Sequence, residues 1–398
     1  MTSSELKAST NMPIQVWILT LAAFAIGTAE FVIAGLLTQL SVSLQITEGQ
    51  VGYLITAYAL AIVFGGPPLT ILLSRFNEKH VLIALLVTFI LGNLVAACTT
   101  DFTLLLVARV FTGLCQGPFY GIGSVVAARM VSKQMEGRAV GQMFAGLTLA
   151  NVLGVPMGAW IGTQFGWATT FFLVGALGVI ALVAIQLWLP SLSAKKSAAS
   201  ISDQLAVFKC PQLLASLAFT VLAWTGFMTF YGYTEAVAVH VVGYSVQGVT
   251  LLLVVVGAGL VLGNSLGGRS ADRSLPKTLM FWPLAMILSL ALIWFMQGSM
   301  WPFAFAAFVF GVASFANVAP MQMRVMKYGS RAPELASTAN ISAFNVANSL
   351  GGIIGGVVVD APSWGPSFIP LAAMVVPIAG WLLIVALEWR PSRILVRT

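Results

Sequence analysis

Charged residues are scarce in this chain of 398 residues: only 8% are Asp, Glu, Lys or Arg, whereas 59% are hydrophobic. An average soluble domain is about a quarter charged. The scarcity excludes a chain that covers itself with a water-facing surface, so we expect its excess apolar surface to face lipid. The 38 glycines and 25 phenylalanines agree with transmembrane helices that pack closely.

Cysteine and catalytic motifs are also lacking. Cys98, Cys115 and Cys210 lie far apart in no metal-ligand spacing, so we interpret them as reduced structural residues and expect no metal site. The sequence has no Walker loop and no recognisable catalytic triad, which argues against an enzyme. The formal charge is +7, but the basic residues form no long run or stripe, so we expect no nucleic-acid partner.

Long apolar runs occupy most of the chain. A helix needs about 20 apolar residues to cross the hydrocarbon core of a bilayer. Because these runs are continuously apolar rather than alternating, they do not resemble the strands of a β-barrel. We therefore predict an all-α integral membrane protein with twelve transmembrane helices, over approximately 14–38, 50–72, 80–99, 102–126, 139–163, 168–190, 211–238, 246–268, 277–297, 301–325, 335–359 and 366–388.

The longest interruption divides the chain into two halves of six spans. It covers residues 191–210, is rich in Ser, Ala and Lys, and is predicted to be a linker between residues 1–190 and 211–398. Six is an even number, so the halves share one orientation and form parallel repeats. Transporters built in this way hold their site near the middle of the membrane, between the halves.

Short motifs recur between the halves. Asn151 and Gly154 match Asn348 and Gly351 at an offset of 197 residues. The loop segments LLSRFNEKH (72–80) and GGRSADRS (267–274) occupy equivalent places after the second and eighth spans. This repetition supports the division at mid-chain.

Basic residues indicate the orientation. Apart from Arg109, which lies inside a span, all of them fall in alternate connecting segments, tails included. The positive-inside rule therefore places both termini and the linker in the cytoplasm. The N-terminal segment lacks the pattern of a cleaved signal peptide, and we interpret it as a cytosolic tail before a retained span. The basic residues in these segments are Lys7, Arg75, Lys79, Arg129, Lys133, Arg138, Lys195, Lys196, Lys209, Arg269, Arg273, Lys277, Arg324, Lys327, Arg331, Arg390, Arg393 and Arg397.

Three motifs resemble those of a known family. GGRSADRS (267–274) resembles the cytoplasmic loop signature of the major facilitator superfamily, and VARVFTGLCQG (107–117) resembles its fourth-span element. GLTLANVLGVPMGAWIG (146–162) resembles the fifth-span motif associated with antiporters. The segments GTAEFVIAGLLTQL, SRFNEKHVLI and QMRVM are most similar to bacterial drug:proton antiporters, in particular arabinose-efflux permeases and sugar-efflux transporters. The resemblance covers essentially the whole chain and implies the major facilitator fold in a bacterial inner membrane.

The resemblance also implies that two cytoplasmic loops gate the transporter. The acidic and basic residues of such loops join helix ends in one conformation and release them in another. The first loop contributes Ser74, Arg75 and Lys79, with Ser74 where the general motif has Asp, and the second contributes Asp272 and Arg273. Alternatively, the basic residues serve only as topology signals.

The fifth span has a face of small residues. Gly154, Gly158 and Gly162 recur every four residues, and Gly146 precedes them. Pro156 interrupts the backbone hydrogen bonds and is expected to bend the helix. We interpret these residues as packing residues rather than ligands, and expect the span to pack closely against a partner in the other half and so seal the cavity.

Two acids and one Arg are candidates for proton coupling. Glu30 lies about eight residues from the outer end of the first span and Arg109 about seven from the outer end of the fourth, so both lie about 10–12 Å deep. The family resemblance implies that these spans line one cavity, in which the two residues could form a proton site or a static ion pair. Glu235, in YTE (233–235), has a possible counterpart in TAE (28–30), although it could simply be solvated.

Aromatic and amide side chains are candidates for lining a small-molecule cavity. Each could equally be a packing residue or an anchor at the lipid interface. The candidates are Phe119, Tyr120, Trp224, Phe227, Tyr231, Tyr233, Asn317 and Gln322.

Without a nucleotide-binding motif, transport must draw on a gradient. We predict a monomeric secondary active transporter in the lipid bilayer that exports small neutral or amphipathic molecules, such as sugars or drugs, in exchange for protons by alternating access. The proton is the coupling ion, and no other cofactor is expected. A proton-coupled importer, an uncoupled facilitator and a membrane sensor without transport are the alternatives.

Overall fold

The computed structural model describes residues 11–46, 48–191, 200–361 and 363–389, and the regular structure within these ranges is entirely helical. In hydrocarbon every backbone N–H and C=O must be satisfied inside the protein, which favours helices for such apolar segments. Local sequence fixes where some of them begin. Asn77 accepts a hydrogen bond from the backbone N–H of Lys79, and Asp101 accepts one from Leu104, so each caps a helix start.

The first half contains the elements up to Trp188. In order they are α1 (Ile14–Phe31), η2 (Val32–Gly35), α2 (Leu37–Leu44), α3 (Glu48–Leu60), η3 (Ala61–Gly65), α4 (Gly66–Leu73), α5 (Glu78–Cys98), α6 (Phe102–Arg129), η4 (Lys133–Met135), α7 (Glu136–Leu149), η5 (Ala150–Gly154), α8 (Val155–Phe165) and α9 (Trp167–Trp188).

The linker and the second half follow. The linker contains α10 (Ile201–Leu205) and η6 (Ala206–Lys209). The second half consists of α11 (Pro211–Tyr231), α12 (Thr234–Val237), η7 (Ala238–Val242), α13 (Val246–Met296), α14 (Met300–Phe315), α15 (Val318–Tyr328), α16 (Pro333–Asp360), η8 (Pro366–Phe368) and α17 (Ile369–Trp389).

The predicted spans agree with these helices. Nine helices of the described ranges are long and apolar enough to cross a membrane. One of them, Gly248–Met296, has 49 residues and breaks its helical geometry at Ser274, so it holds the eighth and ninth spans. The first span contains a shorter apolar helix, Ile14–Glu30, and the fifth is interrupted by η5. The all-helical membrane fold is therefore confirmed.

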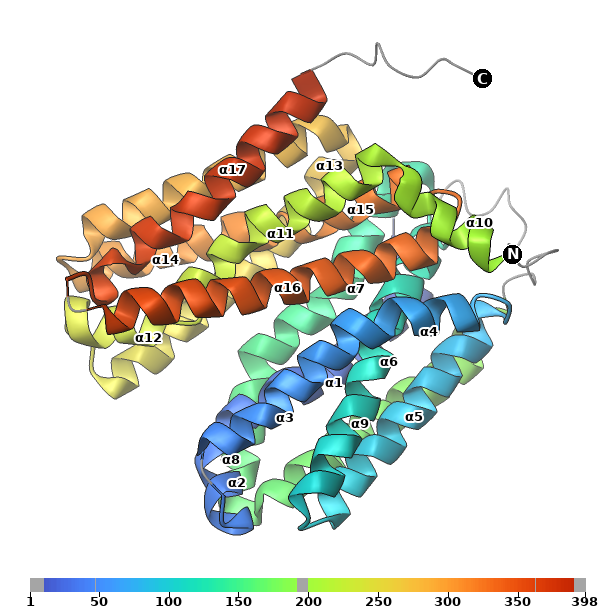
Figure 1. Cartoon of the computed structure of the whole chain (residues 1–398), viewed down its shortest axis with the longest axis horizontal. Coiled ribbons are helices and arrows are strands. Elements are labelled where there is room, and N and C mark those ends of the chain that lie inside the picture. The colour runs from blue at the N-terminus through green and yellow to red at the C-terminus, as the bar shows by residue number, and fades with distance from the viewer. Residues whose placement is uncertain (1–10, 47, 192–199, 362, 390–398) are drawn as a thin grey trace.

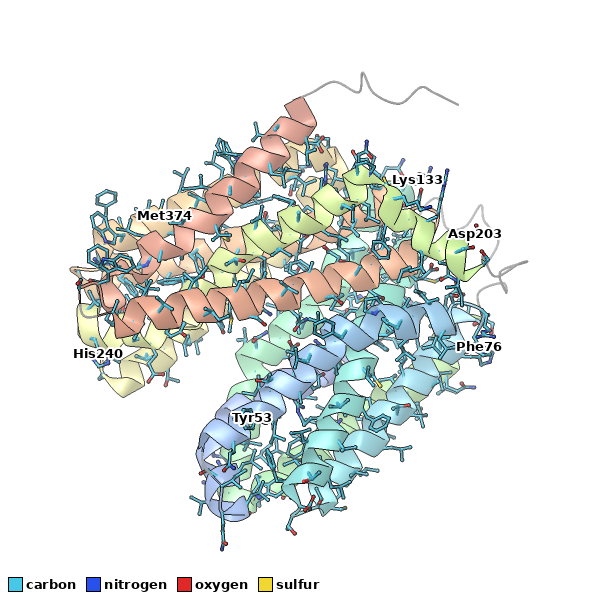
Figure 2. All side chains as sticks on the ribbon, viewed as in Figure 1. Tyr53, Phe76, Lys133, Asp203, His240 and Met374 are labelled. Atoms are coloured by element: carbon cyan, nitrogen blue, oxygen red, sulfur yellow. The ribbon has the colours of Figure 1, made fainter. Side chains whose placement is uncertain are left out.

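The helices form two groups that converge at one end and diverge at the other (Figure 1). We call the end where they converge, beside α10, the linker end, and the opposite end the open end. Lys133 and Asp203 lie at the linker end, whereas Tyr53 and His240 lie at the open end (Figure 2). The basic residues Lys7, Lys195, Lys196, Arg390, Arg393 and Arg397 lie outside the described residues.

Two spans change to π-helical geometry immediately before proline. The second does so at η3 and continues through Gly66 into α4, where prolines occupy the first turn. The fifth does so at η5, just before Pro156. Proline offers no backbone N–H to the preceding turn, so a widened turn accommodates it. The irregularity expected at Pro156 thus takes the form of a π-helical turn.

The glycine face of the fifth span packs against the first span of the same half. A Cβ atom added at Gly146 would meet the backbone of Thr20, and one at Gly154 would lie 2.6 Å from Thr28 Oγ1. Gly158 and Gly162 likewise face side chains that follow α1 in sequence. The expectation that this face packs against the other half is therefore wrong: its glycines bring the first and fifth spans together.

Contact of the fifth span with the second half occurs nearer the linker end. There Gly137 and Gly141 face α13 so closely that an added Cβ would lie 2.6 Å from Gly268 O and 3.0 Å from Asn264 O, respectively. Asn264 Nδ2 also donates a hydrogen bond of 2.6 Å to the backbone oxygen of Gly141. A different pair of glycines on the fifth span therefore takes part in the interface between the halves.

The linker helix docks at the linker end. Gln204 is buried, and its Nε2 atom donates a hydrogen bond of 2.8 Å to Ser74 Oγ in the first half. Val207 is also buried, in a hydrophobic cluster with Val325 and Leu335 of the second half. The predicted linker is thus partly helical: α10 contacts the first half through Gln204, and η6 contacts the second half through Val207.

Candidate substrate and proton site

A cavity of about 820 Å³ lies between the two halves. This volume is in the range of small-molecule sites, about 300–1,000 Å³. Spans from both halves supply its walls: residues from α1, α6, α7 and η5 on one side, and from α11, α13, α14 and α16 on the other. The cavity therefore lies where a transported molecule could contact both halves at once.

Glu30 lies in the wall of the cavity that the first half provides. Its Oε2 atom accepts a hydrogen bond of 2.6 Å from Gln116 Nε2, and Gln116 also lines the cavity. The Oε1 atom of Gln116 in turn accepts a bond of 2.5 Å from the hydroxyl of Tyr58, a buried residue of α3. The Gln116 amide thus holds the Glu30 carboxylate in place, and Tyr58 of α3 in turn holds the amide.

Arg109 lies beside Glu30 but is almost completely buried, with 1% of its surface exposed. Among the described residues its hydrogen bonds go to backbone oxygens: Nη1 to Ala29 at 2.7 Å and Nη2 to Glu30 at 3.4 Å. Its guanidinium carbon lies 4.1 Å from the centre of the Tyr58 ring, which supplies a cation–π contact. The structure therefore brings Glu30 and Arg109 together through backbone contacts and the Gln116–Tyr58 pair, in place of a direct carboxylate–guanidinium pair.

Aromatic rings dominate the wall that the second half provides. The centre of the Trp224 ring lies 4.5 Å from that of Phe227 and 5.0 Å from that of Phe344. Phe227 also stacks on Tyr231, with their centres 4.9 Å apart. The indole N–H of Trp224 donates a bond of 2.9 Å to Asn348 Oδ1. This wall offers flat apolar surfaces beside an oriented amide.

The described lining has charges of only one sign. Glu30 and Glu235 are its charged members, and Glu235 is exposed on α12. Lys, Arg and His do not occur among the lining residues of the described chain. A site of this kind disfavours anions, because a bound anion would meet carboxylates without a compensating cation.

The predicted lining residues divide into two sets. Tyr120, Trp224, Phe227 and Tyr231 line the cavity, whereas Phe119, Tyr233, Asn317 and Gln322 do not belong to its described lining.

Each residue of the second set is engaged elsewhere. Phe119 is fully buried, with its ring edge-to-face to that of Tyr120. The hydroxyl of Tyr233 donates to Gly352 O at 2.7 Å, and Asn317 donates to a backbone oxygen of its preceding turn. Gln322 lies in the closed region described below. Residue type alone did not distinguish residues that line the cavity from residues that pack between helices.

Four amides that sequence reasoning did not assign to the site line the cavity. They are Gln116, Asn151, Asn345 and Asn348. Asn151 and Asn348 are equivalent residues of the two repeats, so the recurrence of an amide at the same place in both halves was a usable signal. Gln116 lies seven residues after Arg109, two helical turns along one face of α6.

Hydrogen bonds between the halves close the molecule at the linker end. Ser124 Oγ lies 2.7 Å from Ser337 Oγ, and Thr70 Oγ1 lies 2.9 Å from Thr338 Oγ1. Gln322 Nε2 donates to Ser124 and to Ser337. All five residues are buried. These buried contacts close the space between the halves at the end where the two groups of helices converge (Figure 1).

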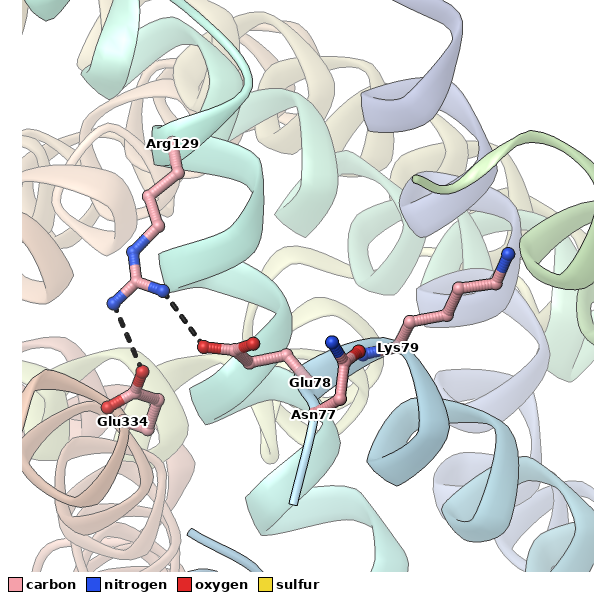
Figure 3. Close-up of polar contacts among 5 residues, drawn as sticks. All are labelled: Asn77, Glu78, Lys79, Arg129 and Glu334. Carbon is pink, nitrogen blue, oxygen red and sulfur yellow. Dashed lines mark hydrogen bonds and ion pairs between the residues drawn. The ribbon is translucent and has the colours of Figure 1, made fainter. Parts of the chain in front are cut away.

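An ion triad also joins the halves there (Figure 3). Arg129, at the end of α6, lies 2.9 Å from Glu78 Oε1 of α5 and 3.2 Å from Glu334 Oε1 of α16. The two carboxylates are buried, with 6% and 7% of their side-chain surfaces exposed. One guanidinium thus bridges both halves, a pairing that could not be predicted from the sequence.

The second gating loop contacts the first half through Asp272. Its carboxylate accepts bonds of 2.6 and 3.2 Å from the backbone N–H groups of Gly137 and Arg138, and lies 3.3 Å from Arg138 Nε. Burial raises the pKa of Asp272 to about 6, although the two hydrogen bonds and the Arg138 charge act to lower it. Arg273, by contrast, is exposed.

The first gating loop (72–80) contributes a different acid, Glu78, which pairs with Arg129 of the same half. Its three predicted gating residues make other contacts. Ser74 accepts the bond from Gln204 of the linker, Arg75 donates to Leu72 O at 3.4 Å, and Lys79 donates to Gln186 O at 2.8 Å. These bonds of Arg75 and Lys79 stay within the first half. The two copies of the loop are therefore engaged differently.

A twelve-span helical fold with a central cavity, closed at one end between two halves, defines a membrane transporter. The model of the Major Facilitator Superfamily matches residues 19–356, and the chain belongs to this family. Members of the family are transporters and not enzymes, so the chain is a transporter of this superfamily.

Relatives cover nearly the full length of the chain. The "Inner membrane transport protein YdhP" of Escherichia coli K12 is 39% identical over 379 residues, which cover 95% of this chain and 97% of the relative. A Helicobacter pylori (strain G27) protein named "Probable sugar efflux transporter" is 28% identical over 347 residues, covering 87% of this chain and 88% of the relative. The similarity to sugar-efflux proteins is thus confirmed.

Solved structures show the same fold. The crystal structure of the transporter FucP in the outward conformation aligns with a TM-score of 0.72 and 16% identity, covering 94% of this chain and 98% of FucP. A variant of the Escherichia coli fucose:proton symporter FucP aligns with a TM-score of 0.76 and 15% identity over the same shares.

Proposed function

We propose that this transporter exports small neutral or amphipathic molecules, such as sugars or drugs, in exchange for protons by alternating access. The observation that carries the proposal is the position of Glu30. It lies in the wall of a cavity that is closed at the linker end, bonded to Gln116 and next to Arg109. The positive-inside rule assigns the linker end to the cytoplasm, so this cavity would face the outside.

In the proposed cycle, Glu30 takes a proton from the outside through the open cavity and releases it to the cytoplasm after the halves have rocked. Because Glu30 lines the same space that a substrate would fill, a substrate and the proton compete for the binding-competent state. The energy of the proton gradient then drives export. The proton is the coupling ion, and no bound cofactor takes part.

The cavity lining supports neutral or amphipathic substrates. Aromatic rings suit flat apolar faces, four amides suit hydroxyl groups, and the two carboxylates oppose anions. The sugar-efflux names of relatives support export of a sugar. We propose that the transporter acts as a monomer in a bacterial inner membrane, in line with the inner-membrane name of YdhP.

The test uses proteoliposomes with an imposed pH gradient and a panel of sugars and uncharged antibiotics. Wild-type protein is expected to move at least one compound against its gradient when protons flow the other way. Glu30→Gln should reduce this uphill movement by about tenfold or more, equivalent to about 1.4 kcal/mol, while substrate binding and folding persist. Asp101→Asn, at an exposed helix cap, is the matched control and should behave as wild type.

Undiminished uphill export by Glu30→Gln would refute the proton site. Uptake in the same direction as the protons would instead identify an importer, and flux that ignores the pH gradient would identify a facilitator.

A further inference from the structure

Four side chains form a continuous row from the cavity into the first half: Glu30, Gln116, Tyr58 and Arg109. The steps are 2.6 Å from Gln116 to Glu30, 2.5 Å from Tyr58 to Gln116, and 4.1 Å from the Arg109 guanidinium to the Tyr58 ring. The row begins at the cavity surface and ends at a residue with 1% of its surface exposed. Within the proposed cycle, only Glu30 has been given a function.

The chemistry of the partners fixes how the amide of Gln116 is turned. An ionised carboxylate can only accept hydrogen bonds, so the NH₂ group of Gln116 must face Glu30. The carbonyl oxygen of the amide then faces Tyr58 and accepts its hydroxyl proton. The single proton of Tyr58 is therefore directed to Gln116 while Glu30 is charged.

A protonated Glu30 changes this requirement. Its carbonyl oxygen can still accept, but its O–H group can now also donate. A second arrangement therefore becomes available, in which the amide has turned over and presents its carbonyl oxygen to Glu30 and its NH₂ group to Tyr58. Tyr58 must then accept rather than donate, and its own proton turns away from Gln116. Half a rotation of one amide thus transfers the charge state of Glu30 to the orientation of the Tyr58 hydroxyl.

We propose that Gln116 and Tyr58 are positioning residues that transmit protonation of Glu30 to the interface between the halves. This inference rests on the proposed function of Glu30 as the proton site. Neither residue takes part in proton transfer. When Glu30 is protonated, the hydrogen bond between Gln116 and the Tyr58 hydroxyl of α3 reverses its direction.

The position of Tyr58 on the second span connects the row to the closed region. One turn further along this span, the backbone oxygen of Ile62 accepts a bond of 3.1 Å from Ser342 Oγ of α16 in the second half. Two turns beyond Ile62, Thr70 lies 2.9 Å from Thr338 of the same helix. The span is π-helical over Ala61–Gly65, a geometry frequently found at functional sites, and α-helical from Gly66 to Leu73. A change at Tyr58 therefore acts on the span that contacts the second half.

Other ionisable groups face Glu30 and must be separated from this effect. Arg109 and Tyr120 lie on α6, Tyr58 lies on α3, and Glu235 lines the same cavity from the second half. Spatial order alone does not demonstrate coupling, so the test must measure proton binding and the conformational response separately.

The experiment titrates the purified full-length protein with protons alone. Infrared difference spectroscopy follows the carboxylic-acid C=O band of Glu30, which is assigned by its loss in Glu30→Gln. Alkylation of Ser124→Cys, in a chain whose native cysteines are replaced, follows opening of the linker end. In the parent protein both signals should change over the same pH range.

Tyr58→Phe keeps the ring beneath Arg109 and removes only the hydroxyl. We expect it to retain the carboxylic-acid titration of Glu30 but to lose most of the pH dependence of alkylation. The change in alkylation rate across the pH range should become smaller by about fivefold or more, equivalent to about 1 kcal/mol of coupling free energy. Gln116→Met, of similar shape but without hydrogen bonds, should uncouple the two signals in the same way. Tyr53→Phe, at an exposed tyrosine of the same helix, should leave both signals unchanged.

The outcomes separate the two proposals. If Tyr58→Phe and Gln116→Met retain the pH-dependent alkylation, the relay is refuted and Glu30 remains the proton site. If either variant abolishes the titration of Glu30 itself, the relay is also refuted, because its members would then act before proton binding. A different result would refute the proposed function: the Glu30→Gln variant would still export its substrate in exchange for protons.

Discussion

At the residue scale, Arg109 is a charge that the membrane interior accepts only because its surroundings are arranged for it. A planar guanidinium can bond two backbone oxygens and stack on a ring at the same time, whereas an ammonium group cannot. Its neighbours supply both kinds of contact, through Ala29 and Glu30 on one side and Tyr58 on the other. The shape of this residue therefore matters as well as its charge.

We predict that Arg109→Lys loses most of its transport although the positive charge is kept. The lysine would forfeit the second carbonyl bond and the ring contact, which we expect to cost about 2 kcal/mol. Uphill export should fall by about tenfold or more, and the thermal unfolding midpoint in detergent should fall with it. Arg331→Lys, at an exposed arginine in the turn between α15 and α16, is the control. Full export by Arg109→Lys would show that charge alone suffices.

Asp272 gives a prediction about pH. Its pKa is raised to about 6 in the closed linker end, against an ordinary value of 3.8 where the carboxyl is exposed. Closing therefore takes up a proton between about pH 4 and pH 6. Its contribution to closure is greatest below the ordinary pKa and is lost as the pH rises through about 6. Glu136 and Arg138 are the charged neighbours.

The measurement is alkylation of Ser124→Cys across that pH range, compared with the same protein carrying Asp272→Asn. The amide variant should lack the component of closure that depends on pH between 4 and 6. Identical pH profiles for the two proteins would contradict this assignment.

At the scale of the element, the close packing of the fifth span against the first is the feature that a mutation can test. An added methyl group at Gly146 would meet the backbone of Thr20, which cannot move out of the way as a flexible side chain can. We predict that Gly146→Ala destabilises the protein by about 1–3 kcal/mol. Gly352→Ala is the matched control, because nothing lies within 4 Å of its added Cβ and alanine favours a helix. Thermal unfolding of both variants in the same detergent measures the difference.

The elements themselves could be predicted from sequence because lipid imposes length and continuous apolarity on each span. The positions and geometry of the interruptions within the helices could be predicted only in part. Pro156 indicated a change of geometry in the fifth span, but its π-helical form depends on packing that local sequence does not specify. The partner of the glycine face was predicted wrongly for a related reason: a stripe of small residues shows that a helix is approached closely and does not show by which helix.

The candidate site was predictable where a residue type is costly in lipid. Glu30 and Arg109 were found because a charge within a span requires a reason. Gln116 and Tyr58 were missed because an amide and a phenol are common in helix interiors, and only their positions show that they connect the two charges. The Glu78–Arg129–Glu334 triad was missed because its members are distant in sequence and lie just outside the predicted spans, where charge is expected anyway.

At the scale of the whole molecule, the ion triad joins the halves through Arg129 and Glu334. Its carboxylates are nearly buried, so breaking one side of the triad should cost more than an exposed pair would. We predict that Arg129→Gln shifts the equilibrium toward opening of the linker end. Alkylation of Ser124→Cys should become about fivefold faster, equivalent to about 1 kcal/mol. Lys133→Gln, an exposed change of the same charge at the same end, is the control, and equal rates in both would refute the assignment.

The close packing of the first and fifth spans has a consequence for what can be carried. It fixes Glu30 within the first half, while Trp224 and its neighbouring rings belong to the second. If the halves rock as units, the distance between the carboxylate and the aromatic wall changes in every cycle. A molecule that touches only one wall binds equally well in both states and exerts no bias on the equilibrium. Molecules too short to span the cavity should therefore occupy it as competitors, and those that reach both walls should be its cargo.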